Sequence, residues 1–266
     1  MKIGNWIEID RLDELSRQDT PMHRLDARSK TLATIAFIVI VMSFPRHEIS
    51  ALMPFLIYPF ALISIGRIPF GFIFRKILVA APFAVVIGIF NPFFDRQPAL
   101  FAGSFAISGG WLSFFSIMIR FGLTVSAALA LAACTGMYGL CGGLERLGLP
   151  RIFAAQLLFL YRYLFVIADE GSRMMRSLEL RSAGLSSLGF RVYGPLVGHL
   201  FLRSLARSER IYQAMVARGF STGEIKIMRE TGFCLKDWAF LTCWTAFFIV
   251  ARIWNLADYV GKLFTG

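Results

Sequence analysis

Titratable side chains are almost absent from the long apolar segments of this 266-residue chain. Five such segments stand out, at 31–44, 49–66, 77–90, 111–135 and 238–254. They contain no Asp, Glu, Lys or His, and their only charged residues are Arg120 and Arg252. Because ion-coupled carriers and proton relays need titratable groups inside the membrane, the sequence argues against a secondary transporter.

Signals for nucleotide and metal binding are also missing. Gly261-Lys262 lacks the glycine spacing and the following Ser or Thr of a phosphate-binding loop. The three histidines have no His or Cys partner at metal-ligand spacing, and the four cysteines form no C-x-x-C pair. No nucleophile elbow or pair of intramembrane acids favours an enzyme. If the chain serves transport, its energy must come from another subunit.

Apolar residues dominate the composition. Hydrophobic residues make up 56% of the chain, with 27 Phe, which is too many for an ordinary soluble domain. The prolines at 54, 59 and 82 fall inside predicted spans, where neighbouring helices can satisfy the freed carbonyls. We predict an all-α integral membrane protein with about five transmembrane helices and a cytoplasmic domain of amphipathic helices before the last span.

Basic residues alternate along the connections between the spans. Before the first span stand Arg17, Arg24, Arg28 and Lys30, and 144–237 holds fourteen Lys and Arg. The connections after the first and third spans hold one each. The net charge of +11 therefore indicates cytoplasmic loops rather than nucleic-acid binding. We expect a multi-pass protein of the plasma (inner) membrane, with the N-terminus and the long polar segment in the cytoplasm.

The predicted organisation has four parts. Residues 1–30 form a cytoplasmic N-terminal segment, 31–135 hold four spans, 136–237 form the cytoplasmic coupling domain, and 238–266 hold the last span and tail. One segment contests this division, because 152–168 is apolar enough for a sixth span. A full crossing there would place the arginine-rich region outside, so we expect a helix that begins at or within the bundle and emerges into the cytoplasm.

Two amphipathic helices with arginine ends are predicted in the polar stretch. Apolar positions at helical spacing follow Leu164 and recur after Phe201. A shift of 37 residues places Arg181 on Arg218, and Gly194-Pro195 is expected to break the chain between the helices. The apolar surface that these helices would offer consists of Met174, Met175, Leu178, Ile211 and Met215.

The second helix is expected to end at Arg218. Gly219 can adopt the left-handed conformation there, and Phe220 can make a packing contact. A cation also suits the negative end of the helix dipole, so one interpretation of Arg218 is a well-capped helix end. The other is a guanidinium that reaches beyond the tip to a carboxylate of a partner protein.

Arg120, within the fourth span, also has two interpretations. The simpler one is an arginine satisfied by helix carbonyls or lying near the outer headgroups. The sharper one is an intramembrane polar lock that holds the fourth span against the cytoplasmic helices.

Several motifs resemble one known family. They are HRLDARSKTL at 23–32, LERLGLPRIFAAQLLFLYRYLFVIADE at 144–170 and YQAMVARGF at 212–220. Their order resembles the transmembrane T component of energy-coupling factor (ECF) transporters, in particular the CbiQ type of cobalt and nickel importers. Ala217, Arg218 and Gly219 match the second of the family's two Ala-Arg-Gly motifs. The first keeps only Arg181, between Leu180 and Ser182, and Ala27 replaces a proline of the family's N-terminal motif.

The resemblance implies partners rather than ligands for this chain. Arg181 and Arg218, with Ala217 and Gly219, would dock two ABC ATPase subunits, and the upper surfaces of the helices would hold a membrane substrate-capture subunit. ATP and Mg²⁺ would bind the ATPases, and Co²⁺ or Ni²⁺ would bind the capture subunit. The alternatives are the T component of a vitamin importer and, from outside this class, a stand-alone membrane enzyme or channel.

Overall fold

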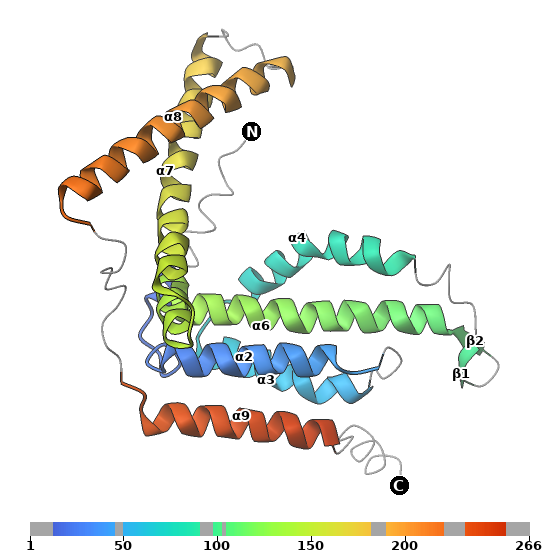
Figure 1. Ribbon diagram of the computed structural model, residues 1–266. Helices are drawn as coiled ribbons and strands as arrows, with labels where there is room; N and C mark the ends of the chain where they lie inside the picture. The colour runs from blue at the N-terminus through green and yellow to red at the C-terminus, as the bar shows by residue number, and fades with distance from the viewer. Residues whose placement is uncertain are drawn as a thin grey trace. The chain divides into compact units, whose positions relative to one another are not determined.

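The computed structural model describes residues 13–45, 50–90, 98–102, 105–181, 190–220 and 232–253, and this part of the chain is predominantly helical (Figure 1). The helices are α2 (Ala27–Met42), the 3-10 helix η1 (Ser50–Leu56), α3 (Ile57–Ile65), α4 (Phe70–Ile89), α6 (Gly109–Arg146), α7 (Arg151–Arg181), α8 (Phe190–Ala217) and α9 (Leu235–Ile253). An antiparallel hairpin of β1 (Pro98–Ala102) and β2 (Phe105–Ser108) was not predicted.

The chain divides into two compact units. The bundle unit consists of 12–143 and 230–266, and the crossed-helix unit consists of 144–229 with 1–11. The bundle unit contains α2, α3, α4, α9 and most of α6, and the crossed-helix unit contains α7 and α8.

Three helices in the described part are long and apolar enough to cross a membrane, namely α4, α6 and α7. The predicted spans at 77–90 and 111–135 fall in α4 and α6, and 152–168 falls in α7. The segment at 49–66 forms a shorter apolar unit because Pro54 lies in the 3-10 turn of η1 that precedes α3. The chain is therefore a membrane protein with several apolar helices.

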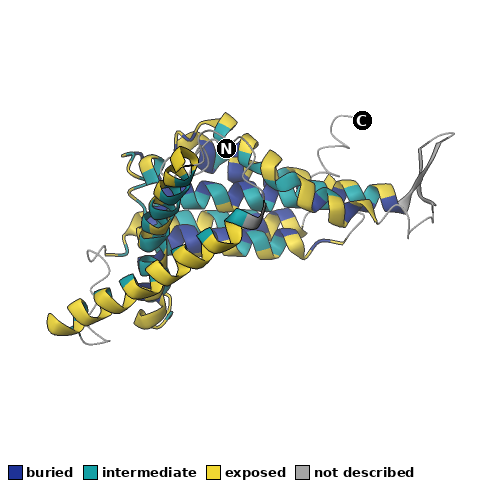
Figure 2. Cartoon of the chain, turned by 90° about the horizontal axis from the view of Figure 1, so that it is seen from above, coloured by how far each residue is buried: buried dark blue, intermediate teal, exposed yellow. Residues whose placement is uncertain are grey.

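Aromatic packing forms the core of the bundle unit. Phe37 of α2, Phe55 of η1, Tyr58 of α3 and Phe248 of α9 have no exposed surface. The rings of Phe37 and Tyr58 lie 4.7 Å apart, and those of Phe37 and Phe248 lie 5.5 Å apart. The Tyr58 hydroxyl also shares a 2.7 Å hydrogen bond with Thr34. These contacts join the consecutive segments α2 and η1–α3 to the distant α9, and Figure 2 shows dark-blue, buried residues along the bundle helices.

A buried carboxylate joins the first residues of α2 and α9. Asp237, which is 3% exposed, accepts hydrogen bonds from the Cys234 amide at 2.9 Å and the Asp26 amide at 2.7 Å. The Ser29 hydroxyl reaches the same carboxylate at 3.4 Å. Asp26 in turn caps α2 by accepting from the Arg28 amide at 2.9 Å. One acid therefore satisfies donors at the beginnings of two helices that are 208 residues apart.

Helix α6 is broken at one glycine. Gly136 has φ +66° and ψ 163°, which a β-carbon disfavours, and an added β-carbon would lie 2.7 Å from the Ser16 hydroxyl. Two residues earlier, the Cys134 carbonyl accepts a 3.1 Å hydrogen bond from the ammonium of Lys30, which is 3% exposed. The buried Lys30 ammonium is therefore hydrogen-bonded to a backbone carbonyl oxygen beside the break in α6.

Two arginines hold the other end of α2. Arg120 of α6 donates to the Pro45 carbonyl, and Arg252 of α9 donates to the Ser43 carbonyl at 3.3 Å. The Arg252 guanidinium also lies 4.2 Å from the centre of the Phe44 ring. These contacts all lie within the bundle unit, so the segment that follows α2 is fixed by two distant helices.

Candidate functional site

Helix α7 combines an apolar first half with an amphipathic second half. Met174, Met175 and Leu178 are half-buried, whereas the neighbouring Arg173, Arg176 and Glu179 are exposed. This alternation is the one-sided pattern that the sequence predicted. The described part of α7 ends at Arg181, which is exposed. Residues 182–184, which complete the first motif, lie outside the described residues.

Helix α8 begins before the predicted break. It runs from Phe190 to Ala217 with Pro195 inside it, so the expectation that Gly194-Pro195 separates two helices is wrong. Pro195 is the sixth residue of the helix, and only its first turns must accommodate the missing amide. Much of the apolar surface of α8 stays open: Phe201 is 60% exposed and Tyr212 is 66% exposed. Such a surface, mixed with arginines, suits a protein partner.

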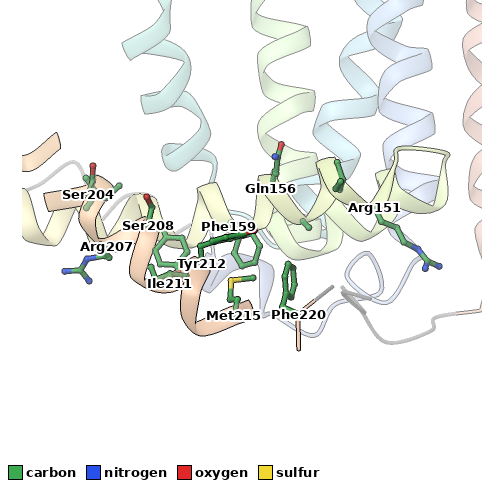
Figure 3. Close-up of a pocket in the computed structure, with 14 residues that line it drawn as sticks. Arg151, Gln156, Phe159, Ser204, Arg207, Ser208, Ile211, Tyr212, Met215 and Phe220 are labelled. Carbon is green, nitrogen blue, oxygen red and sulfur yellow. The ribbon is translucent and has the colours of Figure 1, made fainter. Parts of the chain in front are cut away.

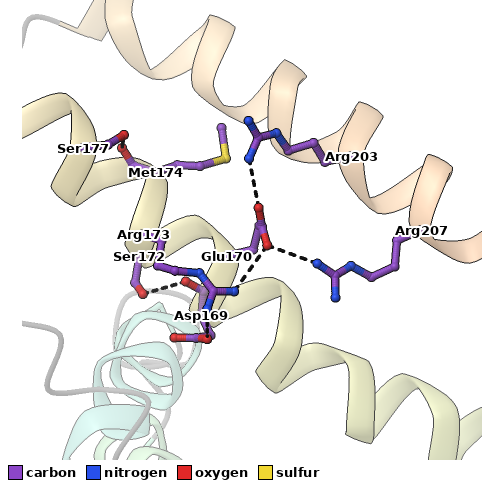
Figure 4. Close-up of polar contacts among 8 residues, drawn as sticks. All are labelled: Asp169, Glu170, Ser172, Arg173, Met174, Ser177, Arg203 and Arg207. Carbon is purple, nitrogen blue, oxygen red and sulfur yellow. Dashed lines mark hydrogen bonds and ion pairs between the residues drawn. The ribbon is translucent and has the colours of Figure 1, made fainter.

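The carboxylate of Glu170 lies where α7 and α8 meet (Figure 4). It accepts hydrogen bonds from Arg203 at 3.0 Å and from Arg207 at 3.1 Å, both on α8, and from Arg173 of its own helix at 3.3 Å. These arginines lower the pKa of Glu170, and the hydrogen bond from Arg203 is the largest cause. The next residue, Gly171, faces α8, because a β-carbon there would lie in van der Waals contact with Leu200, at 3.5 Å.

Two recesses flank this contact. The first, of about 420 Å³, is lined by early residues of α7 such as Phe159 and late residues around α8 such as Ile211, Met215 and Phe220 (Figure 3). The second, of about 840 Å³, is lined by late residues of α7 and early residues of α8. The two helices therefore run in opposite directions past each other, and their carboxyl ends lie on opposite sides of the contact.

The predicted end of α8 is confirmed. Gly219 has φ +77°, its amide donates to the Val216 carbonyl at 2.9 Å, and the Phe220 amide donates to the Met215 carbonyl at 3.0 Å. This pair of hydrogen bonds is a Schellman motif. Met215 and Phe220, the two residues that this motif often brings into apolar contact, both line the first recess. Arg218 thus stands exposed on a rigid turn.

The contact has matched positions on the two helices. Glu170 and Arg207 are 37 residues apart, the same shift that relates Arg181 to Arg218. Arg181 follows Glu170 by 11 residues, and Arg218 follows Arg207 by 11 residues. Both arginines therefore lie roughly 16 Å beyond the contact along their helices. Opposite charges at equivalent positions were a signal for the contact that the sequence analysis missed.

The structure places the remaining predicted site residues in different parts of the molecule. Met174 and Leu178 line the second recess, whereas Ile211 and Met215 line the first. Met175 lines neither of these two recesses. Arg120 belongs to the bundle unit, where its guanidinium donates to Pro45. Among the residues that the structure describes, no three His, Cys, Asp or Glu side chains gather as a metal site would require.

Comparison with known proteins assigns the chain to a family. A family model described as "CbiQ: Cobalt transport protein" matches residues 18–228. The energy-coupling factor transporter transmembrane protein EcfT of Heliobacterium modesticaldum is 28% identical over 258 residues, covering 90% of this chain and 95% of the relative. EcfT of Bacillus subtilis is 26% identical over 220 residues, covering 76% and 82%. The nickel permease LarQ of Lactiplantibacillus plantarum is 32% identical over 140 residues, covering 47% and 51%.

The family model spans both units, from the segment before α2 to the residues after α8. It therefore includes the Glu170 contact and both helix ends with their arginines. The chain belongs to the CbiQ family and is a distant homologue of EcfT, the non-catalytic transmembrane component of energy-coupling factor transporters.

Proposed function

We propose that this chain is the energy-coupling scaffold of an ECF-type ABC importer, and that it transmits the motion of two ABC ATPase subunits to a membrane substrate-capture subunit. The observation that carries the proposal is the pair of exposed arginines, Arg181 and Arg218, at equal distances beyond one contact between two helices. A dimeric ATPase offers two equivalent sites, and two equivalent helix ends match that number.

Each helix end would present its arginine to an acidic group of one ATPase. A guanidinium forms paired hydrogen bonds with a carboxylate, and such bonds are stronger than neutral ones. Ala217 and Gly219 would keep the surroundings of Arg218 small enough for close approach. The half-buried Met174, Met175, Leu178, Ile211 and Met215 would supply adaptable apolar contacts beside the helix ends.

The proposed membrane arrangement follows the charge pattern. Five spans, at α2, η1–α3, α4, α6 and α9, would leave the N-terminus and 136–237 in the cytoplasm, where Lys and Arg concentrate. The apolar half of α7 would begin at the bundle and emerge into the cytoplasm. The protein would thus reside in the plasma (inner) membrane.

The proposed substrate is Co²⁺ or, as the runner-up, Ni²⁺. The family description names cobalt transport, and a relative that matches about half of this chain is a nickel permease. The ion would bind the capture subunit, and ATP with Mg²⁺ would bind the ATPases. A vitamin importer is the second candidate, because the EcfT relative that matches 90% of the chain is named for energy coupling without a substrate.

The proposal is tested by reversing the charge of one helix end. Coexpressed with its native neighbours, Arg218→Glu should remain in the membrane but retain less ATPase and lose most ⁵⁷Co²⁺ or ⁶³Ni²⁺ uptake, because the ion pair becomes a like-charge clash. Arg181→Glu should act similarly, and the double variant should be worse. The matched control is Arg210→Glu, since Arg210 is exposed on the same helix but donates to the Ala206 carbonyl of its own helix at 3.1 Å.

Identification of the copurifying subunits separates the candidates. Two ATPase copies with a metal-binding capture subunit would support the metal importer, and a vitamin-binding subunit would support the second candidate. Arg218→Glu with wild-type uptake and ATPase content would overturn the docking assignment. Flux or turnover by the isolated chain would indicate a channel or an enzyme instead.

A further inference from the structure

We infer that Glu170 is a positioning residue that pins α7 to α8 and thereby couples the movement of the two helix ends. The inference rests on the proposed function and adds a role to a residue that touches neither end. Glu170 is 11 residues from Arg181 along the chain, so its side chain cannot take part in docking at that end. Its carboxylate pairs with three arginines, two of them on α8.

The geometry of the contact resists sliding of the helices. Arg203 and Arg207 are four residues apart and lie about one turn from each other on the same face of α8. The Glu170 carboxylate lies between them, with one oxygen toward each guanidinium, as Figure 4 shows. Sliding α7 along α8 by one turn, about 5.4 Å, would break at least one of these bonds. Rotation about the contact keeps the carboxylate near both arginines.

Burial supports a role beyond an ordinary surface ion pair. The Glu170 side chain is 19% exposed, whereas its neighbour Asp169 is 64% exposed. Asp169 pairs at 2.9 Å with Arg173 of its own helix. Of these two adjacent acids, Glu170 is therefore the one that faces α8. Arg173 pairs with both acids, and it therefore holds the Glu170 carboxylate from its own helix, α7.

Apolar packing around the contact is incomplete. Gly171 adds no side chain to the crossing, and the half-buried Leu196 and Ile211 of α8 line the recesses on either side of it. The charged cluster therefore lies between two open recesses rather than within a packed apolar core. Without a charged Glu170, Arg203 and Arg207 would repel each other beside the neutral side chain, and the helices would slide or separate more readily.

The experiment measures the separation of the helix ends and the yield of transport. Cys234 and Cys243, which are exposed, are first replaced by serine, while Cys134 and Cys141 are buried and stay. Nitroxide labels are then placed at Leu180→Cys and Val216→Cys, near the two ends, where the native side chains are 79% and 51% exposed. Pulsed electron resonance records the distance distribution in the complete transporter in nanodiscs, with and without ATP.

Glu170→Gln should broaden the distance distribution and lower metal uptake per ATP hydrolysed by at least about five-fold, the low end of typical coupling strengths. ATPase content should stay near wild type, because both helix-end arginines remain. Asp169→Asn is the matched control, since it removes the same charge one residue away. Arg207→Gln should broaden the distribution as well, and adding it to Glu170→Gln should broaden it by less than the sum of the two single effects, because both substitutions remove the same pair.

The outcomes distinguish the two proposals. If Glu170→Gln matches Asp169→Asn in both the distance distribution and uptake per ATP, Glu170 is not the pin. If the effects of Glu170→Gln and Arg207→Gln add in full, the Glu170–Arg207 pair is not what fixes the contact. If the unmodified chain fails to retain ATPases at all, the proposed function fails, and this result is visible before any Glu170 variant is compared.

Discussion

The two units differ in the charged residues that surround their exposed apolar side chains. In the bundle unit, Val79 and Phe83 of α4 are 74% and 72% exposed, in a stretch from 77 to 90 with no charged residue. In the crossed-helix unit, Phe201 and Tyr212 are similarly open, but arginines stand among them. The first pattern suits lipid and the second suits protein. Exposure alone therefore does not identify a binding surface, and the accompanying charges do.

The units also differ in how polar groups hold them together. The bundle unit buries Asp26, Ser29, Lys30 and Asp237, each less than 10% exposed, and uses them to join distant helices. The crossed-helix unit joins its helices through one acid and two arginines, of which Arg203 is exposed and Arg207 is half-buried. Loss of a buried group leaves unsatisfied donors without water, so the bundle should be the more sensitive unit.

The largest expected effect is that of Asp237→Ala. The substitution removes the acceptor for the Asp26 and Cys234 amides and should lower the free energy of unfolding by about 3 kcal/mol. Thermal unfolding in detergent measures it. Asp237→Asn keeps one acceptor oxygen and should lose less, and Asp19→Ala is the control, with a side chain that is 72% exposed. Equal stability of Asp237→Ala and Asp19→Ala would show that the Asp237 carboxylate contributes nothing to stability.

An intermediate effect is expected for Gly136→Ala. The left-handed φ of +66° and the nearby Ser16 hydroxyl both oppose a β-carbon, so the bundle should lose about 1–2 kcal/mol. Gly122→Ala is the matched control in the same helix, since an added β-carbon there meets no atom within 4 Å. The same unfolding measurement applies, and a stabilising Gly136→Ala would mean that the break in α6 is not fixed by its surroundings.

The smallest expected effect is the response of the crossed helices to acid. The folded pKa of Glu170 lies below its ordinary value of 4.5, so its charge stabilises the contact above that pH. The stabilisation is lost as pH falls through the lower folded pKa. Labels near the helix ends should show a broader distance distribution only below about pH 4.5 in wild type and no acid response in Glu170→Gln. A transition near neutral pH would point to a different group.

Local features were predictable and tertiary ones were not. The cap at Gly219 was predicted because glycine after a helix specifies its own conformation. The beginning of α2 was placed four residues late, since hydropathy marks a span while the Asp26 cap marks the helix. Asp237 was assigned to the end of the polar domain, whereas it lies in the first turn of α9. Its partner Asp26 is 211 residues away, and no local pattern reveals that contact.

The interior of the candidate site was hidden for the same reason. Arg181 and Arg218 could be singled out because motif and helix end coincide in sequence. Glu170 looked like one more charge on the polar face of an amphipathic helix. Its burial beside Arg203 and Arg207 depends on the antiparallel contact of two helices, which spacing within either helix does not encode.

The equal spacing of the two arginines from the Glu170–Arg207 contact has a mechanical meaning. If the two helices turn about this contact as one rigid unit, the segments from the contact to Arg181 and from the contact to Arg218 act as lever arms of equal length. With 11 residues on each arm, a rotation moves both helix ends through equal distances. The two ATPases of the proposed complex would then receive equal displacements from one chain, and lengthening one arm by a helical turn would make the displacements unequal.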